Sequence, residues 1–193
     1  EVDNRELIQN ALNFIYPDVT LPHRCQGVLL CGGIGAAPSS TLDRFLQEVQ
    51  SGMQEGVRGS EVALRVERLW VPSLFFHDGT AVASAHRIRT LFQTARCSTL
   101  GTTILVLEDI SGLGGNLSRT AQLVVDELAR ALGEGGSKFS SSVFVVATCA
   151  HGGDVHSAVS RHLYVLETPL ADVIGAGQNR KSGSVVVVPP PPQ

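Results

Sequence analysis

The chain has 193 residues, and its 15 Lys and Arg residues against 18 Asp and Glu residues give a formal net charge of −3. This length suggests one domain or one domain with appendages, and the slight acidity excludes a basic nucleic-acid-binding module. With 43% hydrophobic and 17% charged residues, the chain has enough apolar material for a core and too little charge for a disordered protein. Aromatic residues make up only 5%, so we expect a core of Val, Leu, Ile and Ala, which is typical of a buried parallel sheet.

The sequence shows no sign of membrane insertion or secretion. No apolar run approaches the roughly 20 residues of a membrane-spanning helix. The first residues lack the basic and apolar stretches of a signal peptide. We therefore expect a soluble, cytoplasmic protein.

The four cysteines, Cys25, Cys31, Cys97 and Cys149, are widely spaced and form no C-x-x-C pair. Such spacing favours buried thiols over a disulfide or zinc framework. The six histidines are scattered as well. The sequence therefore predicts no metal site built from cysteine or histidine.

The hydrophobic pattern predicts helices and strands that alternate along the chain. Helical spacing of apolar residues indicates helices over 4–15, from about 40 to 49, over 81–97 and over 117–132. Apolar or alternating runs indicate strands over 27–31, 62–66, 104–107, 143–146 and 163–166, with a loop over 51–60. Because such alternation implies crossover connections, the sequence predicts an α/β fold with a doubly wound, mostly parallel five-stranded sheet.

The composition changes after about residue 170. Gly, Ser and polar residues lead there to four valines at 185–188 and then to four prolines. Polyproline cannot join the interior of a sheet. We therefore expect an α/β domain over 1–172 and a linker or tail over 173–193.

The first candidate site is the turn that follows Cys31. In a doubly wound sheet, ligands bind at the carboxyl ends of the strands, and this turn leads into a predicted helix N-terminus, where amide groups attract anions. The candidate phosphate-binding residues of this turn are Gly32, Gly33, Gly35, Ala36, Ala37, Pro38, Ser39 and Ser40.

This turn departs from the phosphate-loop pattern G-x-x-x-x-G-K-[ST]. If the pattern starts at Gly32, then Ala37 stands at the second glycine, Pro38 at the lysine and Ser39 at the hydroxyl residue. Lysine supplies positive charge to the terminal phosphates, whereas Pro38 supplies neither that charge nor a backbone N–H. Ser39 keeps a hydroxyl group for a magnesium ion. Two interpretations stay open: a plain strand-to-helix turn with proline at the helix start, and residual nucleotide binding.

Polar residues also follow the predicted third and fourth strands. Glu108 and Asp109 come directly after four apolar residues, at the place where nucleotide hydrolases hold magnesium and polarise water. Their order is the reverse of the usual Asp then Glu, so the side-chain lengths do not suit these roles. Glu108 is the candidate magnesium ligand of the pair, and an acidic strand end that meets solvent or a neighbouring subunit is the alternative. At the end of the fourth strand, Thr148 is placed to sense a phosphate.

Taken in order, these segments resemble the large subdomain of AAA+ ATPases, especially the type II group with two such domains in tandem. Residues 27–32 (G-V-L-L-C-G) resemble the family's strand before the phosphate loop, 104–109 its acidic strand, and 145–148 its sensor strand. Residues 162–172 resemble the closing strand and the turn after it. The resemblance covers roughly residues 5–172, and it is strongest to the degenerate first ATPase domain of the peroxisome-biogenesis AAA proteins.

The resemblance implies a place in an ATP-driven hexameric ring that threads or remodels protein substrates, here in protein transport at an organelle surface. This chain lacks several of the family's functional groups. The phosphate-loop lysine is absent, Cys149 or Ala150 replaces the sensor asparagine, the arginine pair before the last strand is reduced to Arg161, and the helical lid is not evident. We therefore expect a catalytically silent AAA+ domain with no ATP or magnesium, or with both weakly bound. It would contact other AAA+ subunits, and Arg161 would reach a neighbour's phosphates; the alternative is that Arg161 is only a solvated surface residue.

Two alternatives stay open. One is an AAA+ domain that still binds ATP and hydrolyses it slowly through Ser39, Glu108 and Asp109. The other is a Rossmann-type nucleotide or S-adenosylmethionine enzyme that uses the turn glycines, with Glu67 as the acidic residue that holds a ribose.

Overall fold

The computed structural model describes residues 4–21, 25–32, 38–56, 64–76, 80–97, 102–134 and 143–168. The helices in these segments are α1 (Asn4–Ile15), α2 (Pro38–Gly56), α3 (Ser73–Phe76), α4 (Ala81–Arg96), α5 (Arg119–Glu134) and α6 (Ser157–Ser160), with short 3₁₀ turns η1 (Ser111–Leu113) and η2 (Gly152–Asp154). The strands are β1 (Gly27–Gly32), β2 (Arg65–Trp70), β3 (Thr103–Glu108), β4 (Val143–Cys149) and β5 (Tyr164–Thr168).

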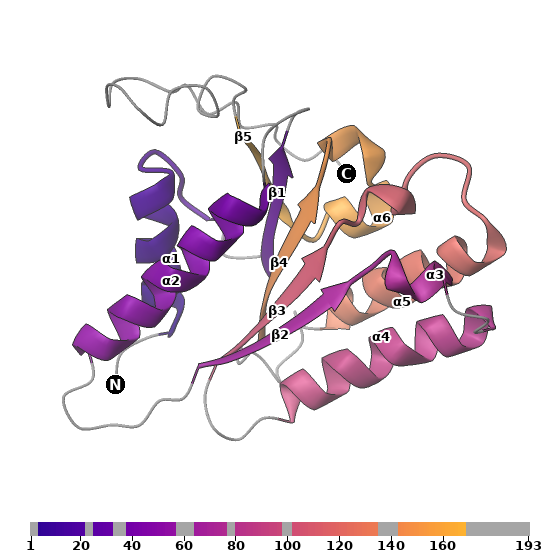
Figure 1. Cartoon of the computed structure of the whole chain (residues 1–193), viewed down its shortest axis with the longest axis horizontal. Coiled ribbons are helices and arrows are strands. Elements are labelled where there is room, and N and C mark those ends of the chain that lie inside the picture. Colours follow the sequence, from indigo (N-terminus) through magenta and orange to yellow (C-terminus); the bar gives the residue numbers. More distant parts are fainter. Residues whose placement is uncertain are drawn as a thin grey trace.

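All five strands are parallel and form one sheet in the order β2-β3-β4-β1-β5 (Figure 1). The strands β1, β3 and β4 lie inside the sheet, and nearly all of their residues are buried. This explains why they read as unbroken apolar runs. The predicted α/β fold with a doubly wound parallel sheet is confirmed.

Helices cover both faces of the sheet (Figure 1). On one face, α1 and α2 pack against Val28 and Leu30 of β1 and the residues of β3 and β4 on that side. On the other face, α3 to α6 pack against Leu29 of β1, with Leu105 and Leu107 of β3. Because successive residues of a strand point to opposite faces, each apolar strand supplies both cores.

Two element boundaries differ from the prediction. Helix α2 continues to Gly56, through residues predicted as a loop, because Val49 and Met53 stand one helical turn apart and are both buried. Strand β2 runs to Trp70, four residues beyond the predicted end. It pairs with β3 along its whole length. Because β2 is an edge strand, it tolerates polar residues, and these residues kept its second half from matching the apolar pattern used for prediction.

Other predictions can be compared only in part. Cys31 and Cys149 are buried as predicted, but Cys97 is exposed and Cys25 is half-buried, because these two lie outside the sheet. The proposed boundary between residues 172 and 173 lies outside the described residues and stays a prediction. Within the described segments, every helix is too short or too polar to span a bilayer.

Candidate functional site

The site is defined by the point where the connections of neighbouring strands diverge. After β1 the chain passes to α2, whose Leu42 and Phe45 join one core. After β4 it passes to α6, whose Val159 joins the other core. The strands β1 and β4 are hydrogen-bonded neighbours. In open α/β sheets, ligands bind outside the carboxyl ends of two such strands, so the candidate site lies beyond Gly32 and Cys149.

The structure describes only part of the candidate phosphate loop. Gly32 is the last residue of β1 and is buried. Pro38 and Ser39 form the start of α2, and Ser40 follows on an exposed part of that helix. The loop residues Gly33, Gly35, Ala36 and Ala37, and the side chains of Pro38 and Ser39, lie outside the described part of the chain.

Pro38 is the first residue of α2. The first amide groups of a helix have no partner within the helix and can bind an anion. Proline has no N–H, and its fixed φ suits the first helical position. The residue at the lysine position of the pattern therefore begins a helix and offers no hydrogen-bond donor.

Thr148 joins the ends of β3 and β4. Its Oγ1 accepts a hydrogen bond of 3.0 Å from the Asp109 N–H, and its carbonyl oxygen accepts one of 2.9 Å from the Ile110 N–H. The structure thus brings together two residues that the sequence analysis placed at separate strand ends. The Thr148 side chain is buried and already holds the backbone of Asp109.

Asp109 has an unusual backbone conformation. Its φ is 57°, and it is the one non-glycine residue of the described segments with a positive φ. For residues other than glycine this region costs about 1–2 kcal/mol, least for Asp and Asn. The hydrogen bond to Thr148 helps to hold this conformation, and the Asp109 carboxylate is exposed at the carboxyl edge of the sheet.

An arginine that the sequence analysis missed engages Glu108. Arg68 Nη1 lies 3.5 Å from Glu108 Oε1, and Arg68 Nη2 lies 2.9 Å from Asp43 Oδ1. Arg68 thus bridges α2 and the end of β3 from the edge strand β2. No sequence pattern indicated the ion pair of Arg68 with Glu108, because this pair depends on the register of β2 and β3, which sets Trp70 beside Glu108.

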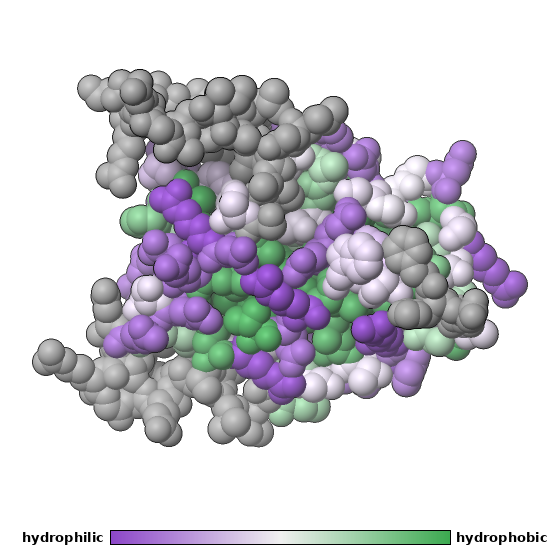
Figure 2. All heavy atoms as spheres, in the orientation of Figure 1, coloured by the Kyte–Doolittle hydropathy of each residue, from purple (hydrophilic) through white to green (hydrophobic). Residues whose placement is uncertain are grey.

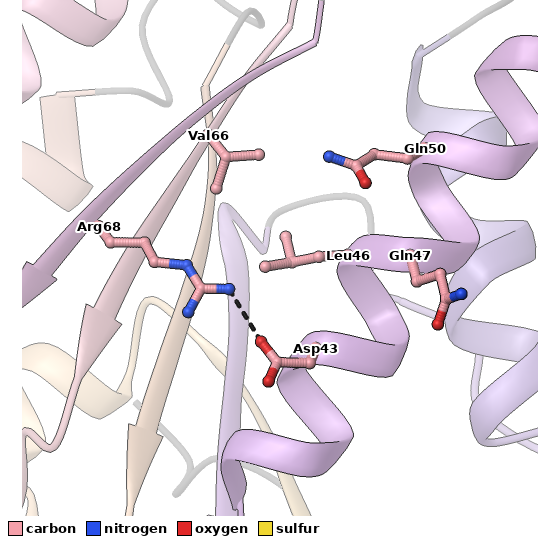
Figure 3. Close-up of a pocket in the computed structure, with 6 residues that line it drawn as sticks. All are labelled: Asp43, Leu46, Gln47, Gln50, Val66 and Arg68. Atoms are coloured by element: carbon pink, nitrogen blue, oxygen red, sulfur yellow. Dashed lines mark hydrogen bonds and ion pairs between the residues drawn. The ribbon is translucent and has the colours of Figure 1, made fainter.

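A hollow of about 520 Å³ lies between α2 and β2, on the face of the sheet that α2 covers. Figure 3 shows the Arg68–Asp43 ion pair at one end of it. In the view of Figure 2, hydrophobic side chains gather near the centre of the molecule, between the positions of α2 and α4. The residues that line the hollow are Asp43, Leu46, Gln47, Gln50, Val66 and Arg68.

Arg161 does not lie with the other candidate residues. It is exposed, it follows α6, and it precedes β5, with its Nε 3.2 Å from His162 Nε2. Because β5 runs parallel to β1, Arg161 lies at the amino edge of the sheet and the candidate site at the carboxyl edge. The five residues of β5 separate these edges by about 17 Å. Burial and the charge of Arg161 lower the pKa of His162.

The Rossmann-type alternative does not fit the strand order. Its ribose-binding acid belongs at the end of a strand adjacent to β1. Here β3 and β4 lie between β1 and β2, and Glu67 sits within β2, where it pairs with Arg65. Glu67 is therefore not placed to bind a ribose held by the turn after β1.

The comparisons with known proteins bear on the fold. No protein-family model matches the sequence, and no curated protein matches it. A chain of the HORMA:CdnC:Trip13 complex from E. coli MS115-1 is similar over 85% of this chain and 56% of its own, with a TM-score of 0.58 and 14% identity. The FIGL-1 AAA domain is similar over 84% of this chain and 50% of its own, with a TM-score of 0.54 and 17% identity.

This chain shares its fold with these two structures, one of which is an AAA domain. The AAA+ resemblance is thus confirmed for the fold, whereas the closer likeness to the peroxisome-biogenesis proteins stays a prediction. The chain spans about half the length of the solved chains it matches. The described residues hold no group of three or more His, Cys, Asp or Glu side chains suited to a metal ion.

Proposed function

We propose that this AAA+ domain is catalytically silent and serves as a structural or regulatory part of a protein-remodelling or protein-translocating AAA+ assembly. The observation that carries the proposal is Pro38, which occupies the lysine position of the phosphate-loop pattern and begins α2. A phosphate loop acts through backbone N–H donors and a lysine charge. Pro38 provides neither, so the start of α2 is poorly suited to the terminal phosphates of ATP.

The acidic residues support the same conclusion. Glu108, the candidate magnesium ligand, shares its carboxylate with Arg68 at 3.5 Å. A magnesium ion bound there would have to compete with a guanidinium group already in place. Ser39 remains the other candidate magnesium ligand, but a hydroxyl group alone binds magnesium weakly.

The surroundings of the site support a role through protein contacts. One of the similar solved chains belongs to a complex named for several proteins. We infer that neighbouring AAA+ subunits, in a ring, are the partners of this domain and that a protein is the substrate of the assembly. The hollow between α2 and β2, lined by four polar residues together with Leu46 and Val66, offers a largely polar surface beside the site for such a neighbour.

Arg161 fits a role toward another subunit. It lies too far from the carboxyl edge of its own sheet to reach a phosphate there, and it is exposed. An arginine supplied by a neighbour can stabilise the charge that develops on a transferred phosphoryl group. Arg161 would act in this way on the phosphates of an adjacent, active subunit.

Titration calorimetry with Mg-ATP tests the proposal. We expect no binding heat up to about 1 mM ATP, which corresponds to a binding free energy weaker than about 4 kcal/mol. The Pro38→Lys, Ala37→Gly double variant restores the two missing residues and is expected to bind more tightly. Its partner control, Ala37→Gly alone, restores the glycine without the charge. A micromolar Kd for the unaltered chain would overturn the proposal in favour of residual ATP binding.

A further inference from the structure

Two cysteine side chains meet where β1 and β4 end. Cys31 and Cys149 are paired residues of these adjacent parallel strands. Their sulfur atoms lie 3.3 Å apart, and the Cys149 thiol donates a hydrogen bond to the Cys31 sulfur. Cys31 is 4% exposed and Cys149 is 2% exposed. The chain separation of 118 residues explains why no sequence spacing predicted the pair.

The backbone at this pair is compatible with a disulfide bond. Neighbouring strands lie about 4.7–4.9 Å apart, within the roughly 4.4–6.8 Å range of Cα separations that disulfides span. A sulfur–sulfur bond is about 2.05 Å long, so the sulfur atoms need to approach by little more than 1 Å. Side-chain rotation can supply much of this movement without separating the strands.

The pair is shielded from solvent by its surroundings. The η2 turn covers Cys31 so closely that a β-carbon on Gly152 would lie 3.4 Å from the Cys31 sulfur. The hydrogen bond to Cys31 and burial raise the pKa of the Cys149 thiol. Both effects favour the protonated form of the Cys149 thiol, so we expect its oxidation to be slow. The shielding by η2 admits a small uncharged oxidant more readily than a bulky or charged one.

We propose that Cys31 and Cys149 form a two-thiol redox site that a small peroxide converts into an intramolecular disulfide. In the first step a deprotonated sulfur attacks the peroxide O–O bond, gains one oxygen and releases hydroxide, which takes up a proton. The second thiol then attacks that sulfur, loses its proton, and expels the oxygen as water. Overall the two thiols lose two protons and two electrons, and hydrogen peroxide becomes two molecules of water.

This bond would act on the edge of the sheet where the candidate site lies. It would tie β1 to β4 one residue from Gly32 and one residue from Thr148. The relative position of these strand ends would then be fixed covalently in the oxidised protein. The site does not depend on the proposed silence of the domain toward ATP.

Peptide mapping after peroxide treatment tests the proposal. The folded chain is treated with hydrogen peroxide and then denatured in the presence of N-ethylmaleimide, which blocks the remaining free thiols. It is digested with trypsin without reductant and analysed by mass spectrometry. We expect a reducible cross-link between the Cys149 peptide and the 25–44 peptide, which contains both Cys25 and Cys31. A Cys25→Ala variant assigns the bond, because the cross-link then can form only through Cys31.

Three results would overturn the proposal. Cys31 and Cys149 could be recovered as maleimide adducts, each could be oxidised separately to a sulfinic acid, or Cys149 could be linked to Cys97 instead. The exposed Cys97 provides the matched control, because Cys97→Ala should leave the cross-link unchanged and Cys149→Ala should abolish it. Peroxide treatment in urea should give mixed pairings; the same single cross-link in urea would show that the native geometry does not direct it.

Discussion

Glu127 is a charged residue inside the helical layer of the fold. Its side chain is 7% exposed and is held by two arginines: Arg89 from α4, through bonds of 3.0 and 2.9 Å, and Arg130 one turn along α5. The hydrogen bonds to Arg89 and Arg130 lower the pKa of Glu127 to about 2. A group whose pKa is lower in the folded state stabilises the fold above its unfolded pKa and loses that effect as the pH falls.

We therefore predict that Glu127→Gln lowers the free energy of unfolding by about 1–2 kcal/mol at neutral pH, since both arginines are half-exposed and their pairing is partly screened. The difference from the unaltered chain should shrink between about pH 4.5 and pH 2. Urea unfolding at several pH values measures it. Asp126→Asn is the control, because Asp126 is an exposed neighbour that accepts a hydrogen bond only from Gln122 among the bonds described. A difference that is constant down to pH 2 would contradict this account.

Asp109 provides a second test at the level of one residue. Asparagine tolerates a positive φ about as well as aspartate, so Asp109→Asn should fold normally. We expect the variant and the unaltered chain to give the same phosphate release from Mg-ATP, at the background rate. The reason is that Glu108 and Asp109 stand in the reverse of the usual Asp-Glu order and that the phosphate-loop lysine and the sensor asparagine are missing from the sequence. A steady phosphate release that disappears in Asp109→Asn would instead indicate residual hydrolysis.

These residues also mark the limit of sequence-based prediction. Glu108, Asp109 and Thr148 were predicted to lie at strand ends, because apolar runs locate the ends of buried strands. The contacts of Arg68 with Glu108 and of Cys31 with Cys149 were not predicted, since both depend on the order and register of strands. The chemistry of the phosphate loop stays a prediction, because most of its residues lie outside the described segments.

At the level of elements, the close contact of β1 with β4 begins at Gly27. A β-carbon placed on Gly27 would lie 1.9 Å from the Val145 carbonyl oxygen. Gly27→Ala must therefore separate the two strands, and we predict a loss of about 3 kcal/mol in the free energy of unfolding. Thermal unfolding measures this loss. Gly153→Ala serves as control, because a β-carbon there meets no atom within 4 Å; an equal loss in both variants would show that close packing at Gly27 is not the cause.

The elements were predicted best where both faces are buried. The strands β3 and β4 and the helices α4 and α5 follow the apolar pattern closely, because burial on defined faces imposes it. The end of the edge strand β2 was predicted too early, since Arg68 directly after Glu67 breaks the alternation of apolar and polar residues. The short helices α3 and α6 have only four residues each and leave no periodic signal.

At the scale of the whole molecule, the strand order and the helices on both faces of the sheet match the fold of an AAA domain. The strand order sets β1 and β4 side by side and opens a site at their carboxyl ends. Arg161 stands at the opposite edge of the same sheet. Under the proposed function, the domain would contact one neighbouring subunit beside its own site and offer Arg161 to another.

Arg161→Ala is expected to slow the ATPase of an active partner subunit, because the arginine would no longer stabilise the transferred phosphoryl group. Loss of an arginine supplied in trans lowers turnover by about 10³-fold or more in other phosphoryl-transfer systems. The steady-state ATPase of the recovered assembly gives this rate, and Arg119→Ala, at the start of α5, is the matched surface control. An unchanged rate in Arg161→Ala would assign the residue to the solvated surface.

The central claim is that this domain works through contacts with other AAA+ subunits. Affinity recovery of the tagged chain from its source cells after mild cross-linking, followed by mass determination of the complex and sequencing of its members, tests it most directly. We predict a complex of several subunits that includes AAA+ proteins with an intact phosphate-loop lysine. A chain that elutes as a monomer, with no AAA+ protein cross-linked to it, would contradict the account.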